Sequence, residues 1–221
     1  MMIGVDMIYI THYTKLVERK KSLINRLQEL GLTNYCFVEQ FDKDTWDMES
    51  LMKEFPQINN ASNKMSEAEK SLALKHAWIV TDMHKRGYSS VLVLEDDVVL
   101  VDDFVEKYNA YMKQMPIDWD VGWVGSCFHL KEPEVPNVNI YRSRRGSRCG
   151  HAYCLSKAFA QKMIHDIRNV DKPADFYYNY IIKKFDLNNY WFQPPLAFQS
   201  LEFTSSLNAN PNHKWNPQEM G

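Results

Sequence analysis

Three consecutive carboxylates, Glu95, Asp96 and Asp97, follow the apolar residues 91–94 and precede a second apolar run at residues 98–100. Acidic side chains this close repel one another, and partial burial further disfavours their charged forms. A hard divalent cation such as Mg²⁺, Mn²⁺ or Ca²⁺ would keep them ionised, because these cations prefer oxygen ligands. Mg²⁺ and Mn²⁺ often bind one or two carboxylates together with phosphate oxygens, so the triplet indicates a site for a phosphorylated ligand.

A solvated turn is the second interpretation of the same residues. In that case the strand ends at the acids, which face water, and Asp96 or Asp97 caps the next segment. Acid pairs at strand ends are common, so the triplet alone does not decide between a turn and a metal site.

The hydrophobic pattern on either side of the acids alternates between strands and helices. It predicts strands at residues 3–10, 35–41, 91–94, 121–124, 152–155 and 190–192, and helices at residues 16–30, 67–86, 104–115, from Ser156 onward and at 175–185. Residues 42–64 are expected to be an irregular surface segment. This alternation is typical of an α/β domain with a mostly parallel central sheet flanked by helices, in which ligands bind at the carboxyl ends of the strands.

Composition and charge limit the classes of partner. Residues 1–221 show no repeat or linker, so we expect a single domain with a polar tail from about residue 208. The net charge of -2 gives no overall attraction to nucleic acid. No apolar run approaches the roughly 20 residues of a membrane span. We expect a cytoplasmic protein with four reduced cysteines, and peripheral contact with a membrane is the alternative.

The sequence contains the segment SEAEKSLALKHAWIV and, about ten residues later, the segment SSVLVLEDDVVL. Together these two segments resemble glycosyltransferase family 25, which includes lipooligosaccharide galactosyltransferases and collagen galactosyltransferase domains. Glu69, His76 and residues 94–97 match the family's motifs. The positions that usually hold Gly, Cys and Ser carry Ser71, Leu72 and Lys75.

Other segments resemble the same family in the same order, from about residue 7 to residue 200. IYITHYTKLVERKKSL resembles the opening strand and the Glu-Arg-Arg segment, which places Arg19 at the matching arginine, although Thr11-His12 replaces the usual Asn-Leu. KPADF resembles a Pro-Val-Asp motif and places Asp175 at its acid. WFQPPLAFQS resembles the family's Pro-Pro-Leu ending.

The resemblance implies a GT-A fold that binds a UDP-sugar with Mn²⁺ or Mg²⁺ and transfers a hexose, galactose or glucose, with inversion. It implies that Asp97 is the direct metal ligand, that Asp96 contacts the ribose or the metal, and that Glu95 acts from outside the first coordination shell. Arg19 would contact the nucleotide. The implied acceptor is a glycan, a lipid-linked glycan or a glycoprotein, as in lipopolysaccharide biosynthesis.

An inverting displacement also needs a base that takes the proton of the acceptor hydroxyl. Asp175 is the candidate by its match to the family, and the alternative is an acid that stabilises a helix N-terminus. Glu202 is the reserve candidate. His151 and His213 are candidates for an additional metal ligand, whereas His76 on an apolar helix face fits a buried core histidine.

Two other classes of function are left open. One is a binding protein that has kept the fold and lost catalysis. The other is a metal-dependent phosphohydrolase or nuclease, which would need a second acidic or histidine cluster that the sequence does not show.

Overall fold

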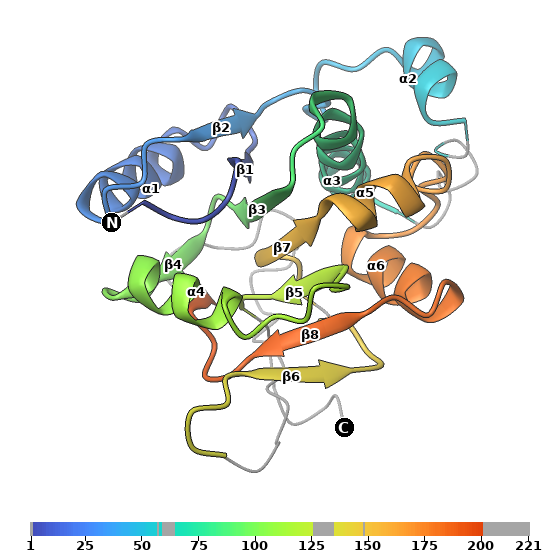
Figure 1. Cartoon of the computed structure of the whole chain (residues 1–221). Helices are drawn as coiled ribbons and strands as arrows, with labels where there is room; N and C mark the ends of the chain where they lie inside the picture. The colour runs from blue at the N-terminus through green and yellow to red at the C-terminus, as the bar shows by residue number, and fades with distance from the viewer. Residues whose placement is uncertain (1, 57, 59–64, 126–134, 148, 201–221) are drawn as a thin grey trace, which may run out of the picture.

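The structure, a computed structural model, describes residues 2–56, 58, 65–125, 135–147 and 149–200 (Figure 1). Glu202, His213 and the tail from about residue 208 lie outside this part, so the single-domain prediction for the whole chain stays a prediction. In chain order the elements are β1 (Met7–Thr11), α1 (Val17–Glu29), β2 (Tyr35–Val38), α2 (Met48–Glu54), α3 (Glu67–Arg86), β3 (Ser90–Glu95), β4 (Val98–Leu100), α4 (Phe104–Met112), β5 (Val121–Trp123), β6 (Ile140–Ser143), β7 (Ala152–Ser156), α5 (Lys157–Met163), α6 (Ala174–Lys184), β8 (Asn189–Phe192) and β9 (Ala197–Gln199).

A seven-stranded sheet in the order β2-β1-β3-β7-β5-β8-β6 forms the centre of the fold. Strands β2, β1, β3, β5 and β8 run in one direction, and β7 and β6 run antiparallel to their neighbours. The predicted α/β class with a mostly parallel sheet is therefore confirmed. β4 and β9 pair separately as a two-stranded antiparallel sheet.

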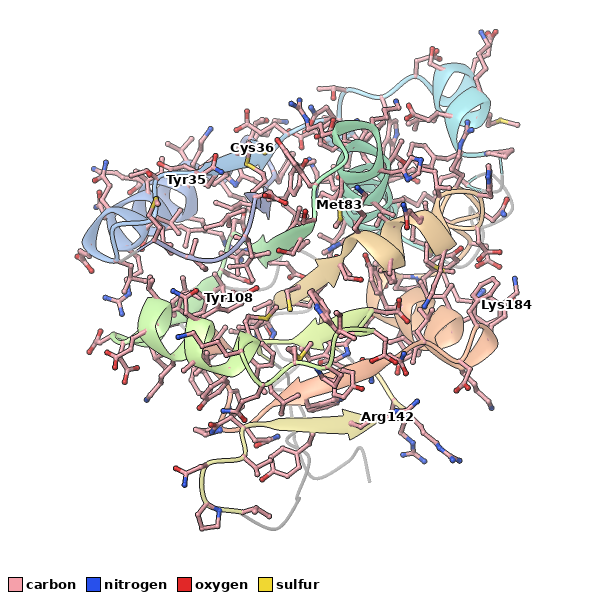
Figure 2. The ribbon with its side chains drawn as sticks, in the orientation of Figure 1. Tyr35, Cys36, Met83, Tyr108, Arg142 and Lys184 are labelled. Atoms are coloured by element: carbon pink, nitrogen blue, oxygen red, sulfur yellow. The ribbon has the colours of Figure 1, made fainter. Side chains whose placement is uncertain are left out.

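Helices cover both faces of the large sheet, which explains the continuous apolar run before the acids. Val91 and Val93 pack in one buried cluster with α3, α5 and α6. Leu92 and Leu94 pack in the other with α1 and α4. Met83 of α3 and Tyr108 of α4, labelled in Figure 2, belong to these opposite clusters. A strand between two helical layers is apolar on both faces because neither face meets water.

The helix flanking the acids begins and ends as predicted. Ser66 and Glu69 form a reciprocal capping box at the N-terminus of α3, and Gly87 ends the helix in the left-handed conformation with φ 70°. Residues 42–64 were wrongly expected to be irregular throughout. Asp47 accepts hydrogen bonds from the backbone N–H groups of Glu49 and Ser50 and so begins the short helix α2.

Several short strands escaped the sequence-based prediction. β4, β6 and β9 have three or four residues each, too few for an alternating pattern to be recognised. The first strand is also shorter than predicted, because it begins at Met7 and not at residue 3.

The structure bears on two expectations from the sequence, the absence of a membrane span and the reduced state of the cysteines. No helix in the described ranges is both long enough and apolar enough to cross a bilayer.

The expectation of four reduced cysteines is wrong at Cys149, which is disulfide-bonded, whereas Cys36 and Cys154 are free. Disulfides persist mainly in oxidising compartments, so this bond does not support the expected cytoplasmic location.

Candidate functional site

A pocket opens where the carboxyl ends of β1 and β3 meet the first turns of α1 and α3. Its walls come from five parts of the chain that are far apart in sequence. The lining residues are Thr11, His12, Tyr13, Leu16, Arg19, Lys43, Ala68, Ser71, Leu72, Lys75, Glu95, Asp96, Asp97 and Gln199. The site thus lies at the strand ends where the sequence predicted it, and it contains all three acids and Arg19.

Arg19 joins the two aspartates of the triplet. It lies on the buried face of α1, and one guanidinium nitrogen is 2.9 Å from Asp96 Oδ1 and 3.2 Å from Asp97 Oδ2. The three side chains are less than a tenth exposed. The positive charge of Arg19 offsets the repulsion between the two acids, because all three groups are held in a low-dielectric environment.

The second oxygen of Asp96 is also engaged. His12, directly after β1, places Nδ1 2.7 Å from Asp96 Oδ2. The carboxylate can only accept, so this ring nitrogen carries the proton. Both oxygens of Asp96 therefore have partners within the protein.

Asp97 is held differently, by a strand from the end of the described chain. Gln199 of β9 donates from Nε2 to Asp97 Oδ2 at 3.3 Å, and the backbone N–H of Ser200 donates to the Asp97 carbonyl at 2.8 Å. Asp97 Oδ1 is buried and has no hydrogen-bond partner among the described residues. Burial, with the nearby charge of Glu95, raises the pKa of Asp97 to about 6 in spite of Arg19.

Glu95 faces a second group of polar residues on the other side of β3. Its Oε1 lies 3.7 Å from His76 Nε2, and an added Cβ on Gly150 would lie only 3.1 Å from the same oxygen. Burial and the charge of Asp96 raise the pKa of Glu95 to about 7. Burial lowers the pKa of His76 to about 4, so this histidine is neutral near pH 7.

His76 is fixed by two buried tyrosines. Its Nδ1 is 2.6 Å from the hydroxyl of Tyr153, which in turn donates to the hydroxyl of Tyr178 at 3.0 Å. The sequence-based interpretation of His76 as a buried, hydrogen-bonded histidine matches this arrangement. Its position beside Glu95 could not be read from helix periodicity, because it depends on the packing of α3 against β7 and α6.

Asp175 lies in the first turn of α6, close enough to Glu95 and His76 to interact with both electrostatically. Burial is the main cause that raises its pKa, and with the charge of Glu95 it brings the value to about 6. A hydrogen bond of 2.8 Å from the backbone N–H of Phe176 opposes this shift. Asp175 does not line the pocket itself.

The remaining predicted residues divide into two groups. His151 is buried beneath β9, with Nε2 3.4 Å from the Ala197 carbonyl, and burial lowers its pKa to about 4. It does not line the pocket. Glu202 and His213 lie outside the described residues, so their roles stay predictions.

Sequence reasoning missed several lining residues. Gln199 belongs to the segment WFQPPLAFQS that resembles the family's ending, and that match could have pointed to it. Lys43 lies in an irregular segment with no motif, and nothing in the sequence separates it from other surface lysines.

The donor set fits a hard divalent cation at one position. Within the described ranges, no three His, Cys, Asp or Glu side chains form a ready-made metal cage. Mg²⁺ and Mn²⁺ need fewer protein ligands when phosphate oxygens complete the shell. Asp97 Oδ1 offers a buried carboxylate oxygen without a partner in the described structure, whereas both oxygens of Asp96 already accept a bond, from Arg19 or from His12.

A family model described as "Glycosyltransferase family 25 (LPS biosynthesis protein)" matches residues 5–178. The chain belongs to glycosyltransferase family 25. The resemblance seen in the sequence is thereby confirmed, and the protein is a glycosyltransferase. The matched range contains Arg19, the acidic triplet and Asp175, but not β9 with Gln199.

Solved structures similar to this glycosyltransferase are distant in sequence. One, a glycosyltransferase involved in the glycosylation of the major capsid of PBCV-1, is 11% identical with a TM-score of 0.48, over 90% of this chain and 93% of that chain. Another, A197 from STIV, is 12% identical with a TM-score of 0.44, over 88% of this chain and 85% of that one. No curated protein sequence matches this chain.

Proposed function

We propose that this glycosyltransferase moves a hexose, galactose or glucose, from a UDP-sugar to an acceptor hydroxyl, with a divalent cation and with inversion at the anomeric carbon. The observation that carries the proposal is Asp97 Oδ1, a buried carboxylate oxygen without a described partner beside a pocket rich in acids. Leaving such an atom unsatisfied is unfavourable, and a cation held by a diphosphate would satisfy it.

The residues of the pocket have distinct roles in this proposal. Asp97 would hold the cation, Mn²⁺ or Mg²⁺, which when bound supplies positive charge that stabilises the diphosphate leaving group. Arg19 holds both aspartates in place through its bonds to each, and its charge opposes the rise in the pKa of Asp97. Asp96 orients Arg19 and His12 by accepting a bond from each. Glu95 lines the pocket, and its charge raises the pKa of Asp175.

Asp175 is the proposed base for the acceptor hydroxyl. A base is most effective when its pKa lies near the working pH, and burial has moved the pKa of Asp175 upward to about 6. Its electrostatic interaction with Glu95, which lines the pocket, supports this role, and Asp175 itself is not one of the lining residues. The proposed acceptor is a glycan, free, lipid-linked or on a protein.

The test is calorimetric titration of UDP into the protein with and without Mn²⁺, repeated on Asp97→Ala. The proposal expects binding that needs both Mn²⁺ and Asp97, followed by hydrolysis or transfer of a hexose when UDP-sugars are screened. If UDP does not bind under any condition, the proposal is wrong, and a binding protein that lacks catalysis becomes the better account. Release of sugar or phosphate at the full turnover rate without an acceptor would indicate a hydrolase.

A further inference from the structure

Three cations line the pocket, and two of them are already paired with acids of the protein. Arg19 bonds to Asp96 and Asp97. Lys75 of α3 places Nζ 2.6 Å from Asp42 Oδ1, and both side chains are less than a tenth exposed. These two positive charges are therefore largely offset before any ligand enters.

Lys43 is the third cation, and it has no ion pair among the described residues. Its ammonium group lies over the ring of Tyr13, 5.0 Å from the centroid, and both residues line the pocket. The charge of Lys43 contributes to lowering the pKa of the adjacent Asp44. The Asp44 carboxylate, however, forms its ion pair with Lys15 and accepts a hydrogen bond from the hydroxyl of Tyr13. Lys43 thus presents a positive charge to the pocket without a carboxylate in contact.

The segment that carries Lys43 is anchored on both sides of the pocket. The hydroxyl of Ser71 donates to the Phe41 carbonyl at 2.7 Å. Asp42 accepts from Lys75 on α3, and it also accepts from the backbone N–H of Thr14 at 3.0 Å and from its hydroxyl at 2.6 Å. The backbone next to Lys43 is consequently fixed to α3 and to the segment after β1, so the lysine is positioned by the fold.

We propose that Lys43 binds a phosphate oxygen of the nucleoside diphosphate in this pocket, an inference that rests on the proposed function. The pocket would then contact the diphosphate at two places, through a cation at Asp97 and through the ammonium group of Lys43 beside Tyr13. A lysine ammonium suits this contact because it is a compact charge with three donors on a flexible stem.

Lys43→Met tests the contact, since methionine keeps an unbranched stem over Tyr13 and removes the charge. Lys15→Met is a matched control: Lys15 also lies near the Tyr13 ring, at 6.0 Å from the centroid, but it is exposed and does not line the pocket. Calorimetry with Mn²⁺ would compare uridine, UMP and UDP on the wild type, on both variants and on Lys43→Arg.

The expected result is a loss of at least about 10-fold in UDP affinity for Lys43→Met, because a hydrogen bond to a charged group is removed. Uridine affinity should change by less than about 2-fold, Lys15→Met should match the wild type, and Lys43→Arg should recover most of the binding. Equal UDP affinity in Lys43→Met and wild type would overturn the inference alone. A wild type that binds no UDP would overturn the inference together with the proposed function.

An anionic group on the transferred sugar is the other source of negative charge that Lys43 could meet. UDP-glucose and UDP-glucuronate distinguish the two sources. If Lys43→Met binds UDP and UDP-glucose as the wild type does and loses affinity only for UDP-glucuronate, Lys43 contacts a sugar carboxylate, and the phosphate assignment is wrong.

Discussion

The carboxylates around the site have pKa values well above those of exposed acids, about 6 for Asp97 and Asp175 and about 7 for Glu95, with burial as the main cause. Such groups lower stability near neutral pH, because the folded state binds protons that the unfolded state has already released. Clusters of this kind are more common at functional sites than in cores. The buried acids are therefore expected to lower the stability of the fold and to provide a site for a positive charge.

Asp97→Asn should stabilise the metal-free protein at high pH. The pKa of Asp97 rises from 3.8 in the unfolded chain to about 6 in the fold, so the wild type loses stability as pH rises through this range. The variant's free energy of unfolding minus that of the wild type should therefore be about 1–3 kcal/mol larger at pH 8 than at pH 3.5. Urea unfolding of both proteins in EDTA at the two pH values measures this difference. If the difference does not change with pH, burial does not raise the pKa of Asp97 as stated.

Asp175 gives a prediction about the rate. If it is the base, kcat/KM should rise with pH and level off above a midpoint near 6, because only the carboxylate can take a proton. Asp175→Asn should lower kcat by about 10²–10⁴-fold while UDP affinity stays close to wild type. A variant with a normal rate would transfer the role of base to another residue, and Glu202 would be examined next.

At the scale of elements, the buried ion pair between Lys75 and Asp42 joins α3 to the segments after β1 and β2. Burial lowers the pKa of Lys75 against the effect of Asp42. Burial alone would raise the pKa of Asp42, but the hydrogen bonds from Lys75 and Thr14 outweigh it and lower the value. The 2.6 Å contact between Lys75 Nζ and Asp42 Oδ1 therefore couples the two buried side chains, and each depends on the other.

Lys75→Met should reduce stability by about 3–5 kcal/mol, because Asp42 would remain as an unpaired buried charge. The double variant Lys75→Met with Asp42→Asn should recover a large part of that loss, since no buried charge remains. Chemical unfolding of the three proteins at pH 7 provides the comparison. Additive losses in the double variant would show that the two side chains are not coupled.

The predictability of each element from sequence follows from its length and from how local its causes are. α3 was predicted almost to the residue, because Ser66, Glu69 and Gly87 fix its ends through contacts within a few residues. α2 was missed because it is short and its main local mark is the N-cap Asp47. β9 was missed because its three residues are defined by pairing with β4.

The same distinction applies to the site. The strand-end rule was enough to bring Glu95, Asp96 and Asp97 to a pocket, and the family match added Arg19. The partners of these acids could not be predicted, because His12 reaches Asp96 through the pairing of β1 with β3, and Gln199 reaches Asp97 through the pairing of β4 with β9. Lys43 carries no local pattern, and its position follows from the contacts that fix the segment between β2 and α2 to α3 and to the residues after β1.

For the whole molecule, a ligand in this pocket touches elements from both ends of the described chain and should stabilise all of them together. At 100 times its dissociation constant, UDP with Mn²⁺ should add about 2.7 kcal/mol to the free energy of unfolding. This corresponds to a rise in melting temperature of roughly 5–10 °C for a chain of this size. Thermal unfolding measures it, and a rise of the same size in Asp97→Ala would contradict the proposed role of Asp97.

The hydrogen bonds from Gln199 and Ser200 to Asp97 also have a consequence for synthesis on the ribosome. Gln199 follows Asp97 by 102 residues, so the acids are translated long before the strand that holds them. β9 is not part of the seven-stranded sheet. A nascent chain, or a product cut before Ala197, therefore contains every strand of the large sheet and still lacks both contacts to Asp97, from Gln199 and from Ser200. These two contacts form only after residues 199 and 200 have been synthesised.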